Sequence, residues 1–273
     1  MQPPMFLAGD FKSPLLGPRS PRLFANVALH LFFLGLGIII SAKAADEAGG
    51  APGTQQVHTL QREVAHKVQI QYLLFLPKGY EKSSERWPLI LYLHGGSVRG
   101  DDISQMRKLG IAQKVEANPD FPFIVISPQC HKGEIWTDVA ALGAVLDEVA
   151  RTHRVDPDRI YVTGHSMGGR GALYAAYKMP HRFAAVVALG LYSPITAWAE
   201  KLAAVPLWLF HGPNDQFTPL KEVEELTQAV KAAGGHPQLT VLPERDHYIL
   251  DVYDRPDLYN WLAQQKRKPR NGE

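Results

Sequence analysis

The chain has 273 residues, of which 45% are hydrophobic and 21% charged, and its formal net charge is +2. This composition is that of a globular protein and excludes a disordered chain and a coiled coil. The net excess of positive charge lies before residue 45, where Lys12, Arg19, Arg22 and Lys43 outnumber Asp10. The rest of the chain is nearly neutral, so we expect no nucleic-acid partner, because binding to phosphates requires a concentration of cations.

Cys130 is the only cysteine in the sequence. A single thiol excludes an intrachain disulfide and also a zinc site built from thiolates. We expect neither a metal nor a cofactor, so the fold must be held together by its own hydrophobic core.

The first 44 residues have the pattern of a signal peptide. Basic residues precede an apolar run over 24–40, and Ser41-Ala42-Lys43-Ala44 then offers small residues in the spacing typical of a cleavage site. We expect cleavage after Ala44, which would give a secreted or periplasmic protein without stable membrane insertion. An uncleaved membrane anchor is the alternative, although the run is shorter than the roughly 20 apolar residues that span a bilayer.

Beyond this segment, short apolar runs alternate with longer amphipathic stretches. This alternation predicts one α/β domain over 57–266, with a doubly wound, mostly parallel sheet. Residues 45–56 are expected to form a flexible linker and 267–273 a polar tail. The carboxyl ends of the strands should form the active face. The predicted strands cover 68–76, 88–93, 123–126, 160–163, 183–189, 206–210 and 239–242, and the predicted helices cover 139–151, 168–179, 220–233 and 256–265.

The segment Gly164-His165-Ser166-Met167-Gly168 lies between a predicted strand and a predicted helix. This is the G-x-S-x-G pattern, and its place between a strand and a helix indicates a catalytic serine. The sharp turn there projects the serine from the edge of the sheet. The glycines are needed where a Cβ atom would strike a neighbouring element. A glycine-rich turn with a serine helix cap is the alternative. We expect Ser166 to be a nucleophile, which requires a histidine as general base.

In proteins with this motif the acid and then the histidine follow the serine along the chain. His181 comes just after the next predicted helix, and His211 ends a predicted strand. His236 lies before the strand at 239–242 and so at the wrong edge of the sheet. His247 follows that strand and shares the edge with Ser166, so we expect it to be the base.

Asp215 follows the strand at 206–210, again at the carboxyl edge of the sheet. It can accept a hydrogen bond from one nitrogen of His247 and so fix the tautomer that faces the serine. The alternative is a turn or helix-capping aspartate, a role that Asp often has. Asp246 and Asp251 are rival acids, but Asp246 is adjacent to His247 and would have difficulty reaching its ring.

The strand at 88–93 ends in His94-Gly95-Gly96-Ser97. Small residues here allow main-chain N–H groups to approach a reacting carbonyl. We expect an oxyanion hole from the N–H of Met167 and that of Gly96 or Ser97. His94 itself is expected to be a hydrogen-bonded structural residue.

Loops that follow the strands should line the substrate pocket, which nominates His131, Trp136 and Tyr192. Each could equally be an ordinary loop or core aromatic residue, because such side chains bury a large area. The segment 191–205 is too short for a large lid. We therefore expect an open cleft.

Several stretches together resemble the α/β-hydrolases known as predicted peptidases, near the feruloyl-esterase, polyhydroxybutyrate-depolymerase and prolyl-oligopeptidase-like branches. The resemblance covers about residues 57–265. It implies an α/β-hydrolase catalytic domain and a Ser-His-Asp triad. The group often has glycine where Ser97 stands and leucine where His165 stands. The matching stretches are 72–80, 87–95, 127–130, 156–161 and 164–169.

Together with the export signal expected at the N-terminus, the resemblance implies a secreted serine hydrolase that cleaves carboxylic esters through an acyl-enzyme, on small molecules or on acylated polysaccharide or polyester. An acyltransferase or a peptidase would use the same triad, and a non-catalytic binding module on this scaffold is an alternative of another class. The oligomeric state is not predicted.

Overall fold

The computed structural model describes residues 67–267, so the predicted signal peptide and linker lie outside the described part. Within it, seven strands form one sheet in the order β1-β3-β2-β4-β5-β6-β7. No helix in this part is long and apolar enough to cross a membrane. The strands are β1 (Tyr72–Phe75), β2 (Trp87–Leu93), β3 (Ile124–Pro128), β4 (Val155–His165), β5 (Ala185–Leu189), β6 (Leu207–His211) and β7 (Gln238–Val241).

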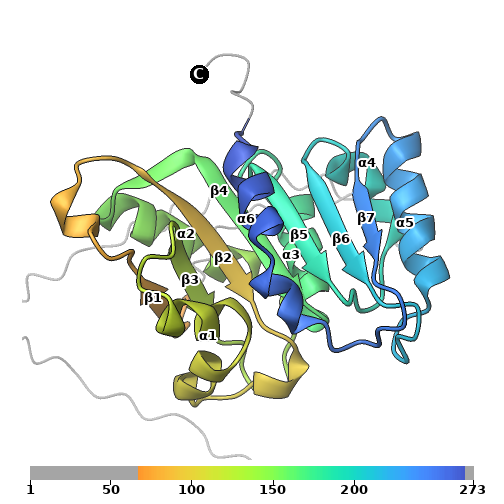
Figure 1. Cartoon of the computed structure of the whole chain (residues 1–273), viewed down its shortest axis with the longest axis horizontal. Coiled ribbons are helices and arrows are strands. Elements are labelled where there is room, and N and C mark those ends of the chain that lie inside the picture. Colours follow the sequence, from red (N-terminus) through yellow and green to blue (C-terminus); the bar gives the residue numbers. More distant parts are fainter. Residues whose placement is uncertain (1–66, 268–273) are drawn as a thin grey trace, which may run out of the picture. The chain divides into compact units, whose positions relative to one another are not determined.

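All neighbouring strands are parallel except β1, which pairs antiparallel with β3 at one edge of the sheet (Figure 1). The central strands are apolar at nearly every position, and β5 is buried along its whole length. This is expected of parallel strands with helices on both faces. The predicted α/β, mostly parallel architecture is therefore confirmed.

In the described residues, six α-helices cover the two faces of the sheet. Helices α2 to α5 contribute side chains to the core on one face, and α1 and α6 contribute to the core on the other. Figure 1 shows α6 crossing in front of the sheet and α3 behind it. The helices are α1 (Gly110–Ala117), α2 (Val139–Thr152), α3 (Met167–Lys178), α4 (Ala199–Leu202), α5 (Leu220–Ala232) and α6 (Pro256–Gln264).

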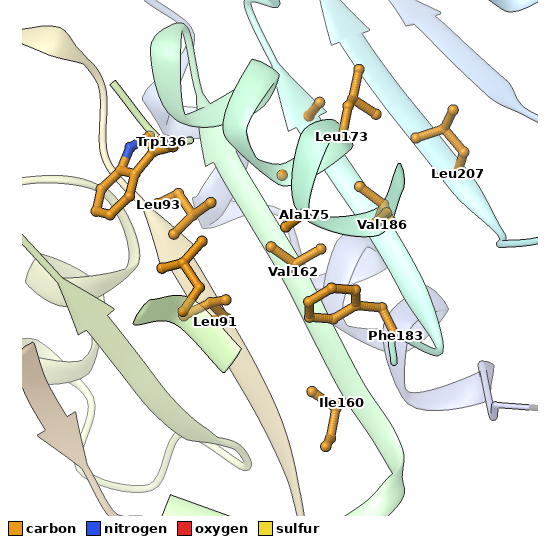
Figure 2. Packing of buried hydrophobic residues seen from close by; sticks show 14 of the residues in the cluster. Leu91, Leu93, Trp136, Ile160, Val162, Leu173, Ala175, Phe183, Val186 and Leu207 are labelled. Carbon is orange, nitrogen blue, oxygen red and sulfur yellow. The ribbon is translucent and has the colours of Figure 1, made fainter. Parts of the chain in front are cut away.

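Each face of the sheet has its own hydrophobic core because successive side chains of a strand point to opposite faces. In β2, Leu91 and Leu93 join the cluster under α2 and α3, whereas Tyr92 joins the cluster under α1 and α6. Figure 2 shows Leu91 and Leu93 beside Val162 of β4. Burial of each such aliphatic side chain contributes about 1.5 to 3 kcal/mol. The result is a rigid frame for the loops at the carboxyl edge.

Several boundaries differ from the sequence predictions, most of all those of β4 and β1. Strand β4 begins at Val155, five residues before the predicted start, because Val155 pairs with Trp87 ahead of a register shift. The intervening residues are polar, so the apolar pattern did not reveal them. Strand β1 is shorter than the predicted run 68–76. Helices α1 and α4 were not predicted, since they are too short to show a helical period.

Candidate active site

Ser166 lies in a strained turn between β4 and α3. Its backbone angles are φ 58° and ψ −121°, a region that side-chain-bearing residues seldom adopt. A Cβ atom on Gly168 would lie 1.9 Å from the carbonyl oxygen of Leu93, and one on Gly164 would lie 2.3 Å from the main chain of Gly168. The glycines of the motif are thus required by backbone contacts, as expected.

The structure brings Ser166, His247 and Asp215 together, although they lie on three separate loops. The Nε2 atom of His247 is 2.8 Å from the Oγ atom of Ser166, and its Nδ1 atom is 2.7 Å from Oδ2 of Asp215. His247 and Asp215 are both buried. These side chains form one continuous path of hydrogen bonds from a carboxylate to a serine hydroxyl.

The loop after β6 fixes the direction of the Asp215 carboxylate. Its Oδ1 atom accepts hydrogen bonds from the main-chain amides of Phe217, at 2.8 Å, and Thr218, at 3.0 Å. Burial raises the pKa of Asp215, but hydrogen bonds from His247 and from these two amides outweigh it, so the pKa lies below its ordinary value. Asp215 therefore caps its own turn with one oxygen and contacts His247 with the other.

The ionised carboxylate determines the tautomer of His247. A carboxylate oxygen can only accept, so the Nδ1 atom of His247 must carry the proton. The Nε2 atom is then left as an acceptor for the hydroxyl of Ser166. Chemically, this arrangement can remove a proton from Ser166 and return it to another oxygen.

The rival acids have other partners. Asp246 accepts a hydrogen bond from the main-chain N–H of Tyr248, at 2.9 Å, and Asp251 forms an ion pair with Arg245, at 2.6 Å. His236 is exposed and lies ahead of β7, away from Ser166. Of the acids considered from the sequence, only Asp215 contacts the ring of His247.

The loop after β2 lies beside the serine. A Cβ atom on Gly95 would be 3.6 Å from that of Ser166, and Gly96 and Ser97 follow in a short 3-10 turn. Met167 is the first residue of α3, so its main-chain N–H has no acceptor within the helix. These groups lie on the two segments next to Ser166, and the donor roles of Met167, Gly96 and Ser97 stay a prediction.

His94 is a buried structural residue, as expected from the sequence. Its Nδ1 atom lies 2.6 Å from the carbonyl oxygen of Gly95, and its Nε2 atom accepts from the main-chain N–H of Cys130, at 3.0 Å. Burial lowers the pKa of His94 to about 4. The indole N–H of Trp136 donates to the carbonyl oxygen of His94, at 2.9 Å, which fixes the base of the loop.

A cavity of about 130 Å³ adjoins the Ser166 turn and is lined by two of the three nominated pocket residues, Trp136 and Tyr192. His131 does not line it: this side chain is exposed and its Nδ1 atom lies 3.2 Å from the carboxylate of Asp101. We call this space the aromatic cavity. Its lining consists of Ile135, Trp136, Thr137, Met167, Arg170, Gly171, Tyr174, Tyr192 and Trp198.

Two exposed aromatic residues that the sequence analysis missed flank His247. The ring of Phe217 lies 4.6 Å from the imidazole, and that of Tyr248 lies 5.6 Å from it. Their exposures of 52% and 62% are the highest of the large hydrophobic side chains in the described part of the chain. Their positions two residues after Asp215 and one after His247 are the signal that could have revealed them.

A parallel sheet with this serine turn, and with the acid and histidine on the following loops, is the α/β-hydrolase fold. The sequence profile of the dienelactone hydrolase family, which has this fold, matches residues 99–268, more than half of the chain. The chain therefore belongs to the dienelactone hydrolase family. This confirms the resemblance to α/β-hydrolases noted from the sequence motifs.

The individual relatives are only distantly similar to this chain in sequence. An S-formylglutathione hydrolase of Bos taurus is 33% identical over 42% of this chain and 40% of its own length. A solved thermostable esterase has a TM-score of 0.63 and 24% identity, covering 73% of this chain and 60% of its own. A solved ferulic acid esterase has a TM-score of 0.55 and 20% identity, and the match covers 70% of this chain and 89% of that protein. The chain spans about half the length of the curated relatives it matches.

Proposed function

We propose that the protein is a serine hydrolase that cleaves carboxylic esters through an acyl-enzyme on Ser166. The observation that carries this proposal is the hydrogen-bonded path from Asp215 through His247 to Ser166, with distances of 2.7 and 2.8 Å. Structural residues seldom form such a path at a strained serine turn. Membership in the dienelactone hydrolase family supports the same conclusion.

In the proposed reaction, Oγ of Ser166 attacks the ester carbonyl carbon while Nε2 of His247 takes the hydroxyl proton. The tetrahedral oxyanion accepts hydrogen bonds from the N–H of Met167 and from that of Gly96 or Ser97. His247 then gives its proton to the leaving alcohol, and the acyl-enzyme forms. Water repeats these steps and releases the acid. Asp215 holds the imidazole in the required tautomer throughout.

The size of the aromatic cavity supports a division of the substrate into two parts. A space of about 130 Å³ accommodates a short acyl chain or a single ring. Phe217 and Tyr248, on the exposed side of His247, offer an open apolar surface to the rest of the ester. We propose that the small group enters the cavity and that the larger part remains on this surface, as an acylated polysaccharide or a polyester would require.

The test is hydrolysis of nitrophenyl esters of increasing chain length and of methyl hydroxycinnamates by purified protein, with Ser166→Ala as the control. Fluorophosphonate labelling of the wild type but not of the variant is the expected result. A protein that neither hydrolyses esters nor reacts with the probe would be a binding module, contrary to the proposal. Product analysis with an acceptor alcohol distinguishes hydrolysis from acyl transfer, and peptide substrates test for peptidase activity.

Export belongs to the same proposal and rests on the apolar run at 24–40 and on Ser41-Ala42-Lys43-Ala44. Mass spectrometry of protein collected outside the cytoplasm should find a chain that begins at Ala45. A mature chain that still contains residues 24–40 would contradict the cleavage and favour the membrane anchor.

A further inference from the structure

His165, the residue before Ser166, makes a direct hydrogen bond to the loop that carries His247. Its Nε2 atom lies 2.7 Å from the main-chain carbonyl oxygen of His247. A carbonyl oxygen only accepts, so the Nε2 atom of His165 must carry a proton and donate it. The last residue of β4 therefore links the nucleophile turn to the loop of its expected base.

This hydrogen bond is enclosed by the fold. His165 is buried, and burial lowers its pKa to about 4. The imidazole is therefore uncharged at neutral pH and acts as a fixed donor. A Cβ atom on Gly190 would approach the carbonyl oxygen of His247 to 2.8 Å and Nε2 of His165 to 3.1 Å, so only glycine leaves room for the contact. Gly190 also has a φ angle of 48°, which favours glycine.

Other contacts hold the loop on either side of His247. Asn214 donates its main-chain N–H to the carbonyl oxygen of Arg245, at 3.0 Å, and the Arg245 guanidinium donates to the carbonyl oxygen of Tyr248, at 3.2 Å. Within residues 67–267, the side chain of His165 is the one that hydrogen-bonds to the main chain of His247 itself. It therefore ties the main chain of His247 to the residue that precedes Ser166.

We infer that His165 is a positioning residue that fixes the distance between His247 and the hydroxyl of Ser166. The inference rests on the proposed function. His165 does not contact the Ser166 hydroxyl, so it has no part in proton transfer. Loss of its hydrogen bond would leave a buried carbonyl without a donor and free the loop to shift. A shift of about 1 Å in a reacting group can cost about 100-fold in rate, whereas substrate affinity depends on the cavity and changes little.

The test compares three replacements of His165. Gln has an amide nitrogen at about the reach of the imidazole Nε2 atom, Asn has one that is too short, and Leu has no donor. We expect kcat for nitrophenyl acetate to fall about 100-fold in His165→Leu and His165→Asn, with KM nearly unchanged. His165→Gln should stay within about fivefold of the wild type. His236→Leu, at an exposed histidine, is the matched control and should have wild-type kinetics.

The Gln and Asn variants keep the test decisive if His165→Leu does not fold. Melting temperatures and fluorophosphonate labelling rates are measured in parallel, so that loss of folded protein is separated from loss of reactivity. Equal activity of folded His165→Gln and His165→Asn would overturn the inference. So would a large rise in KM with unchanged kcat. A wild type that shows no Ser166-dependent hydrolysis would instead contradict the proposed function, which keeps the two failures distinct.

Discussion

The Oδ2 atom of Asp215 lies 2.7 Å from Nδ1 of His247, while Oδ1 of the same carboxylate is held by two main-chain amides. The direction of the carboxylate is thus set by its own loop and not by the histidine. An isosteric change at Asp215 should keep this turn in place while altering only the contact with His247.

Asp215→Asn is therefore expected to fold and to lose activity. The amide offers a donor or a weaker acceptor to Nδ1, which disfavours the required tautomer and removes the charge that stabilises the imidazolium. We expect a loss of up to roughly 10⁴-fold in kcat. Asp246→Asn and Asp251→Asn should remain active, because those carboxylates bind Tyr248 and Arg245 instead. A fully active Asp215→Asn would refute the assignment.

Ser166→Ala and His247→Ala should each reduce kcat by as much as about 10⁶-fold, because triad residues act as a unit. Both variants should lose fluorophosphonate labelling. His236→Ala makes the same chemical change at an exposed site. It should neither reduce kcat nor abolish fluorophosphonate labelling. If His236→Ala and His247→Ala had the same effect, the placement of the base would be wrong.

Gly168→Ala should destabilise the fold. The added Cβ would lie 1.9 Å from the carbonyl oxygen of Leu93, so the main chain must move, at a cost on the order of 3 kcal/mol. Gly143→Ala in α2 is the matched control, since its Cβ would lie 3.6 Å from the sulfur of Met179. Its free energy of unfolding should rise by about 0.5 to 1 kcal/mol, because alanine has a higher helix propensity than glycine. Urea unfolding of both variants measures these opposite changes in the free energy of unfolding.

Stability should fall as the pH is lowered from about 6.5 toward 4. Burial lowers the pKa values of His94 and His165 to about 4, so both stay neutral in the folded protein. The unfolded chain takes up their protons near pH 6.5, and the free energy of unfolding then drops by about 2 kcal/mol for each group by pH 5. Above about pH 7.5 neither group changes the free energy of unfolding with pH, because both are then neutral in the unfolded chain as well.

Urea unfolding between pH 7.5 and 5 measures this effect. His94→Asn removes one of the two groups and should flatten the dependence by about half, even though the variant is less stable overall. A slope identical to that of the wild type would show that His94 does not titrate as described.

Trp198→Ala should widen the aromatic cavity and shift the preference toward longer acyl chains. Trp198 lines the cavity, so removing its indole creates space for additional methylene groups. The ratio of kcat/KM for nitrophenyl hexanoate to that for the acetate should rise about tenfold. Tyr177→Ala is the control, because Tyr177 stacks on Trp198 at 5.4 Å but does not line the cavity. An equal change in both variants would indicate indirect repacking.

Buried strands and the serine turn were readily predicted, because both leave local patterns in the sequence. The apolar runs located all seven strands, and the spacing of Gly164, Ser166 and Gly168 located the turn. The order of residues along the chain nominated Asp215 and His247, and the structure places His247 between Ser166 and Asp215 within hydrogen-bond distance of both. Their catalytic roles stay predictions that the variants above address.

Features that depend on distant contacts were not predictable. Trp198 reaches the aromatic cavity from a segment without a recognisable pattern, and His131 points to Asp101 instead of the cavity. The hydrogen bond between His165 and the carbonyl of His247 joins residues 82 positions apart. No local pattern encodes a contact between a side chain and a distant main-chain oxygen.

The contact between Gly168 and the carbonyl of Leu93 has a consequence for heat inactivation. Because the nucleophile turn rests directly on the backbone of the adjacent strand, the serine cannot lose its geometry while β2 and β4 remain paired. The shape of the serine turn should therefore persist on heating until the sheet itself separates. The serine turn has no early, local step by which it could lose its shape while the centre of the fold is intact.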